Sequence, residues 1–183
     1  CQDYWHLVQG VWMNSPFFEF NKNYLIRKIA IPCVSLLGKK NPLQLVPGGF
    51  SKQYGISLHK SEKGEWDYDL KLKPHVPPSV TAGWIRAIYK GQQRLNRGIY
   101  IGVPVLILHS SKSSSVNRKW NDKAHRSDII LNVKSIVRKA EKLEGTIELV
   151  EVKGGMHDLF LSVPEVREDA FSKLFAWATK YFS

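Results

Sequence analysis

Cysteine is scarce in this sequence of 183 residues, which contains only Cys1 and Cys33. Two cysteines cannot build a disulfide framework, and these two lack the close spacing of a metal site. A run of about eighteen apolar residues, the length that spans a bilayer, is also lacking, so we expect no transmembrane segment. The sequence implies no metal and no organic cofactor. Low cysteine usage favours a reducing compartment, and we expect a cytoplasmic protein.

The beginning of the sequence carries no signal-peptide pattern. It opens on Cys1 rather than on methionine, and it reaches Trp5 and the apolar stretch Val11 to Met13 almost at once. We therefore expect that a segment precedes residue 1, and such a segment would conceal any signal peptide.

Basic residues exceed acidic residues, and the net charge is +11. Lys and Arg are spread along the chain, in groups such as Lys39-Lys40, rather than concentrated in one run. We interpret them as a solvated basic surface and expect no specific nucleic-acid partner, with nucleic-acid binding as the weaker alternative. Apolar residues make up 43% of the chain, enough for the core of one domain.

The first half of the chain contains one strand-like segment and a long irregular one. Residues 7–14 are apolar and β-prone, and they predict a buried strand that ends before Pro16. Residues 21–98 contain six prolines and show weak apolar periodicity, so we interpret them as an insertion with a few helices. The clearest helix is expected from Thr81 to Leu95, where one face would contain Trp84, Ile85, Ile88 and Leu95.

After Gly98 the pattern predicts alternating strands and helices. Residues 103–109 form a nearly unbroken apolar run, as expected for a strand covered on both faces in a parallel sheet. A helix is expected at 133–143, followed by a second strand at 146–152. Ser162 and Glu165 form a capping box that would begin a helix reaching about Tyr181. This order predicts an α/β fold with a doubly wound, mostly parallel sheet.

Functional groups of open parallel sheets gather in loops after the carboxyl ends of strands. The loop after 103–109 leads to Asp128, and the loop after 146–152 holds His157, just past Gly154-Gly155. Such a short, constrained backbone can hold a general base still. The alternatives are a surface or structural role for His157, and Asp122 or Asp158 as the carboxylate. Asp128 could also be an anion at the N-terminus of the next helix.

Three motifs resemble the C-terminal half of α/β-hydrolases, namely Val103-Pro-Val-Leu-Ile-Leu-His-Ser110, Ser127-Asp128-Ile-Ile-Leu131 and Gly154-Gly-Met-His157-Asp-Leu159. The resemblance is to serine aminopeptidase-like and monoglyceride lipase-like lipases and esterases, including bacterial lysophospholipase-type members. Softer matches are Asn14–Phe18 to a strand end of the core and Gly64–Asp67 with Ala82–Arg86 to a lid. The resemblance implies a core strand and loop at 1–20, a helical lid at 21–98 and a C-terminal core at 99–183.

The triad of this family runs serine, acid, histidine along the chain, which implies Asp128 as the acid and His157 as the base. Asn132 stands where many members carry a second aspartate. Under a lid, an acyl-binding pocket could be lined by Trp66, Tyr68, Trp84 and Tyr89, although aromatic residues in an insertion more often form its own small core. The hydroxyls of Ser110, Ser111 and Ser113 to Ser115 are expected to be solvated in a flexible loop.

The serine nucleophile of the family lies in Gly-x-Ser-x-Gly, and this pentapeptide is missing from the sequence. The resemblance therefore implies a serine hydrolase of carboxylic esters (a lipase, esterase or lysophospholipase) whose nucleophile-bearing part is absent, and this chain alone should be inactive. The alternative is a non-catalytic binding or scaffold protein on a truncated hydrolase fold. An incomplete sheet would expose an edge, so we expect aggregation, a homo-oligomer or a companion chain.

Overall fold

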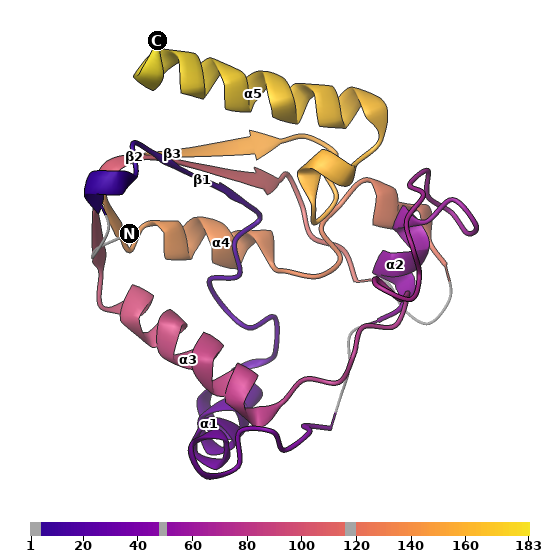
Figure 1. The fold of residues 1–183 in the computed structure, drawn as a ribbon, viewed down its shortest axis with the longest axis vertical. Coiled ribbons are helices and arrows are strands. Elements are labelled where there is room, and N and C mark those ends of the chain that lie inside the picture. The colour runs from indigo at the N-terminus through magenta and orange to yellow at the C-terminus, as the bar shows by residue number, and fades with distance from the viewer. Residues whose placement is uncertain (1–4, 48–50, 116–119) are drawn as a thin grey trace. The chain divides into compact units, whose positions relative to one another are not determined.

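The computed structural model describes residues 5–47, 51–115 and 120–183, and Cys1 lies outside them. The chain folds into two compact units (Figure 1). The sheet unit consists of Cys1–Glu19 and Gly98–Ser183, and the helical unit consists of Phe20–Arg97. The chain thus leaves the sheet unit once and returns to it once.

In the described residues, three parallel strands form the sheet, in the order β1-β2-β3. They are β1 (Val11–Asn14), β2 (Ile99–Ser110) and β3 (Leu143–Val152). Successive residues of the central strand point to opposite faces, and both faces are buried: Leu106 and Leu108 belong to one apolar cluster, Val105 and Ile107 to the other. Burial on both faces explains the unbroken apolar run, and the predicted α/β fold with a parallel sheet is confirmed.

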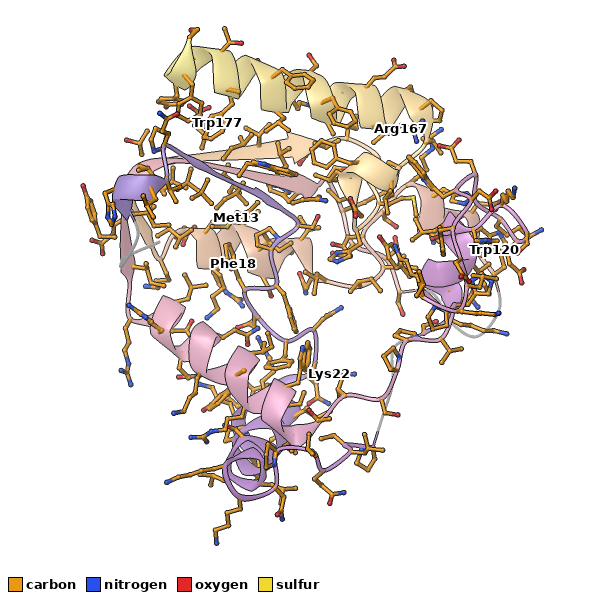
Figure 2. All side chains as sticks on the ribbon, in the orientation of Figure 1. Met13, Phe18, Lys22, Trp120, Arg167 and Trp177 are labelled. Atoms are coloured by element: carbon orange, nitrogen blue, oxygen red, sulfur yellow. The ribbon has the colours of Figure 1, made fainter. Side chains whose placement is uncertain are left out.

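Helices cover both faces of the sheet (Figure 1). The helix α5 (Pro164–Phe182) packs on the Leu106 face through Ala170 and Trp177. The helix α4 (Val133–Ala140) packs on the other face through Ile136. Figure 2 shows Trp177 beneath α5 and Met13 on the α4 side of β1. The sheet is therefore the middle of three layers, as expected for parallel strands.

The helical unit contains α1 (Ile31–Lys40), α2 (Gln53–Leu58) and α3 (Ala82–Asn96). A π-helical turn, Ile26–Ala30, runs directly into α1. The helices α1 and α3 lie against each other, so closely that a Cβ atom at Gly38 would overlap the carbonyl group of Ala82. Thr81 caps α3 by accepting the N–H of Trp84, so the helix expected from residue 81 is present.

Several boundaries differ from the sequence predictions. The strand expected from residue 103 already begins at Ile99. The strand expected from Leu7 begins at Val11, because Trp5–Leu7 forms a 3-10 turn. The helix expected to reach residue 143 ends at Ala140, and Leu143 already pairs with β2 as the first residue of β3.

The predicted capping box at the start of α5 is wrong. The N-cap residue is Val163, and no side chain caps the helix. The reason is that the hydroxyl of Ser162 is used elsewhere, since it accepts the N–H of Met156 at 3.0 Å.

Within residues 5–47, 51–115 and 120–183, the helices are too short or too polar to cross a membrane.

The pairing register of β2 and β3 shifts between Ile101 and Val105, and Gly145 pairs with Ile101 at this irregularity. Replacing Gly145 tests the sheet. Gly145 has a φ of +119°, and a Cβ atom there would overlap the carbonyl oxygen of Ile101. We expect Gly145→Ala to lower the free energy of unfolding by more than about 1 kcal/mol, measured by urea denaturation. Gly102→Ala is the control, because its Cβ would be 3.7 Å from the ring of Tyr100, an ordinary contact. Equal unfolding midpoints for the two variants would contradict this account.

Candidate active site

Asp128 and His157 contact each other in the sheet unit. The Nδ1 atom of His157 lies 3.0 Å from Oδ2 of Asp128. The side chain of Asp128 is fully buried, whereas that of His157 is 26% exposed. The structure thus brings together the two residues proposed from the sequence, one shielded from water and the other accessible.

The backbone holds the carboxylate of Asp128 from the other side. Its Oδ1 accepts the N–H of Ile130 at 2.8 Å and that of Leu131 at 2.7 Å. An ionised carboxylate can only accept hydrogen bonds, so the Nδ1 atom facing Oδ2 is the nitrogen that carries the proton. In the neutral ring this leaves the lone pair on Nε2 of His157, the tautomer that a general base needs.

The two alternative carboxylates have other partners. Asp122 accepts the indole N–H of Trp120 at 2.9 Å. Asp158 accepts the side-chain amide of Asn14 at 2.6 Å. These contacts favour Asp128 as the partner of His157.

The structure also disfavours the alternative that Asp128 serves as an anion at the N-terminus of the next helix. The residue that caps α4 is Asn132, whose side chain accepts the N–H of Ser135 at 3.3 Å. The two N–H groups bound by Asp128 belong to Ile130 and Leu131, before the helix begins. Asn132 therefore has a structural use of its own.

Serine hydroxyls hold the backbone on the N-terminal side of His157. The bonds are Ser111 Oγ to the N–H of Gly154 at 3.2 Å, Ser110 Oγ to the carbonyl of Gly155 at 2.6 Å and Ser162 Oγ to the N–H of Met156 at 3.0 Å. Each of the three residues before His157 is therefore fixed by a side chain. The prediction that Ser110 is solvated is wrong, because this residue is fully buried.

Asn14 holds the backbone on the C-terminal side of His157. Its amide donates to Asp158, and its Oδ1 accepts the N–H of Leu159 at 3.2 Å. Asn14 is the last residue of β1 and Ser110 the last of β2, while the histidine loop follows β3. The carboxyl ends of all three strands thus converge on one loop, as in other open parallel sheets. In the sequence, the feature that could have identified Asn14 and Ser110 was their position at the ends of apolar runs.

The proposed pocket residues lie in the helical unit. Trp66 and Tyr68 follow α2, where the N–H of Trp66 bonds to the carbonyl of Leu58 and the carbonyl of Tyr68 lies 3.1 Å from Nε2 of His59. Burial raises the pKa of the Tyr68 hydroxyl. Trp84 belongs to α3 and is 39% exposed. Contact of these residues with a substrate stays a prediction.

Residues that could hold a metal ion do not gather in the described part of the chain: no three His, Cys, Asp or Glu side chains cluster there.

The three-layer arrangement, with its parallel sheet and convergent strand ends, is the fold of the C-terminal part of an α/β-hydrolase. It matches the crystal structure of the monoacylglycerol lipase of Paleococcus ferrophilus, with a TM-score of 0.64 and 17% sequence identity. It also matches a soluble variant of the monoglyceride lipase of Saccharomyces cerevisiae in complex with a substrate analog, with a TM-score of 0.58 and 15% identity. The predicted resemblance to this kind of hydrolase is confirmed at the level of the fold.

The chain corresponds to only part of each of these enzymes. The matches cover 95% and 93% of this chain, but 60% and 55% of the two lipases. No protein-family model and no curated protein matches the sequence. The likeness is therefore one of fold.

Replacing Ser110 tests how the histidine loop is held. We expect Ser110→Ala to lower the free energy of unfolding by about 1–3 kcal/mol, because the carbonyl of Gly155 loses its buried partner. The exposed Ser115 of the following loop supplies the control Ser115→Ala, which should change stability by less than about 0.5 kcal/mol. Urea denaturation measures both, and no difference between them would show that the Ser110 bond contributes nothing.

Proposed function

We propose that this chain is part of a serine hydrolase that cleaves carboxylic esters, with His157 as general base and acid and Asp128 as the group that orients it. The observation that carries the proposal is the 3.0 Å contact between Nδ1 of His157 and the buried carboxylate of Asp128. The shared fold with two monoacylglycerol lipases supports it. The proposed substrate is accordingly an ester of a fatty acid, such as a monoacylglycerol.

In the proposed reaction, Nε2 of His157 takes the proton of a serine hydroxyl while the serine oxygen attacks the ester carbonyl carbon. The negative charge of Asp128 stabilises the imidazolium that forms. When the tetrahedral intermediate collapses, His157 gives the proton to the departing alcohol and an acyl-serine remains. Water, deprotonated by the same nitrogen, then releases the fatty acid and restores the serine.

The serine would come from outside these 183 residues, because they contain no Gly-x-Ser-x-Gly. An N-terminal segment or a companion chain could supply it. In support, β1 pairs with β2 along one side, and no strand of the described residues pairs with its other side. Such an edge offers unpaired N–H and C=O groups to a further strand or to a second copy of the chain. Trp12 of β1 is 47% exposed and could pack against the added segment.

The helical unit is the proposed lid. Within it, we propose Trp66, Tyr68 and Trp84 as contacts for the acyl chain, because aromatic side chains offer a large apolar area together with fixed polar groups.

Replacing the acid by its amide tests the role of Asp128. In Asp128→Asn one oxygen can still accept the N–H groups of Ile130 and Leu131, which turns the side-chain NH₂ toward His157. The ring should then accept at Nδ1 and carry its proton on Nε2. We expect ¹⁵N NMR of the isolated chain to show this change of tautomer, and turnover of the complete enzyme to fall by about 10⁴. An unchanged tautomer would argue against the assigned pair.

Replacing the base tests the catalytic proposal directly. A fluorophosphonate probe should label the chain joined to its N-terminal segment, or mixed with its companion chain, and leave the isolated 183 residues unlabelled. We expect His157→Ala to abolish this labelling and the control His125→Ala to preserve it. Labelling that persists in His157→Ala would contradict the role of His157. Complete absence of labelling in the assembled protein would favour the non-catalytic alternative.

A further inference from the structure

The positive charge of the chain is concentrated in the helical unit. Residues 20–97 contain 14 of the 27 Lys and Arg residues but only 4 of the 16 Asp and Glu residues, so they carry ten of the eleven net positive charges. Residues 20–61 contain seven basic residues and no acidic residue. This unit therefore has a strongly positive field, whereas the sheet unit is almost neutral.

The helix Ile26–Lys40 is apolar on two opposite sides. Its inner side, with Ile31, Ser35 and Gly38, is buried, and Arg86 of α3 bonds to the carbonyl of Ser35 at 2.9 Å. Its outer side, together with Leu25 directly before Ile26, presents three large aliphatic side chains at intervals of four and seven residues, which places them on one face. They are Leu25 (64% exposed), Ile29 (60%) and Leu36 (68%).

Basic residues border this outer face. Lys22 precedes the helix, Lys28 lies within its first turn, and Lys39 and Lys40 end it, and all four are exposed. The Nζ atom of Lys28 lies 5.9 Å from the ring centre of Tyr24, itself 64% exposed. An apolar stripe bordered by lysine is the pattern of helices that lie in the headgroup region of a membrane.

We propose that the helical unit docks on a negatively charged lipid bilayer through this outer face. The lysines would attract anionic headgroups, and Leu25, Ile29 and Leu36 would enter the boundary of the acyl chains. Charge complementarity selects an anionic bilayer over a neutral protein surface. The aliphatic side chains select it over nucleic acid, because single-stranded nucleic acids are bound by aromatic stacking and leucine gains nothing from phosphate. The face belongs to the helical unit, whereas Asp128 and His157 belong to the sheet unit, so the proposal does not rest on the proposed catalysis.

Vesicle binding by the 183-residue chain tests the proposal. We expect binding to phosphatidylcholine vesicles that contain about one third phosphatidylglycerol to be at least about tenfold tighter than to phosphatidylcholine alone. High salt should weaken it, because the attraction between the lysines and the headgroups is screened. Equal binding to both vesicles, or binding to neither, would overturn the proposal.

Two pairs of variants separate the apolar and the charged contributions. Leu25→Ser/Ile29→Ser/Leu36→Ser should weaken binding at least about tenfold, while Phe175→Ser on α5, at a residue also 62% exposed, should change it less than about twofold. Lys39→Glu/Lys40→Glu should weaken binding far more than Lys134→Glu/Lys142→Glu, which changes the net charge equally in the sheet unit. Circular dichroism establishes that each variant folds. Full binding by the triple serine variant would overturn the role of the helix face.

A fluorophore on Cys33 reports whether this face of the helix enters the bilayer. Cys33 is exposed and lies between Ile29 and Leu36 in the helix. In the Cys1→Ser variant it is the remaining thiol, and its label should shift to shorter wavelength with anionic vesicles. A label that shifts without vesicles as protein concentration rises would assign the face to a second copy of the chain. A shift with single-stranded oligonucleotide and none with vesicles would assign it to nucleic acid. Either result would overturn the proposal.

Discussion

Parallel pairing on both sides of β2 is the constraint on which the rest of the sheet unit depends. Because β1, β2 and β3 run in the same direction, their carboxyl ends lie along one edge of the sheet. Asn14, Ser110 and the loop after Val152 are therefore neighbours, although they are far apart in the sequence. Burial of β2 between α4 and α5 stabilises this pairing, so the geometry around His157 is a consequence of the core.

Hydrogen bonds from distant segments hold the histidine loop. Every residue from Gly154 to Leu159 is joined to another part of the sheet unit by a bond or a buried contact. Buried hydroxyl and amide groups must be bonded to be tolerated, so each bond both satisfies a polar group and restricts the loop. The proposed role of His157 as a general base would require this kind of support, because the ring must meet a serine at a fixed distance.

The two units of the chain have different surfaces. The sheet unit carries nearly balanced charge, whereas the helical unit combines a large positive charge with exposed leucine and isoleucine. Basic residues are spread along the whole chain, but acidic residues are few in the helical unit. The difference in net charge therefore becomes visible when the chain is divided into its two units. A hydrolase of lipid esters needs access to substrate held in bilayers, so the proposed docking face and the proposed catalytic pair would serve one function from separate parts of the chain.

Local patterns of the sequence determined the secondary structure of the sheet unit and the identity of the central pair. The apolar run at 103–109 specified a doubly covered strand, because only burial on both faces tolerates such a run. The Gly-Gly turn marked His157 as the proposed base, and both the loop after 103–109 and the family resemblance pointed to Asp128. Tertiary structure alone decided the partners: Asn14 bonds to Asp158 across 144 residues, and Ser110 and Ser162 are recruited by backbone groups of the loop. Hydrogen bonds between distant segments produce no periodic pattern in the sequence. A serine that caps a helix therefore cannot be distinguished by sequence from a serine that bonds to a distant loop.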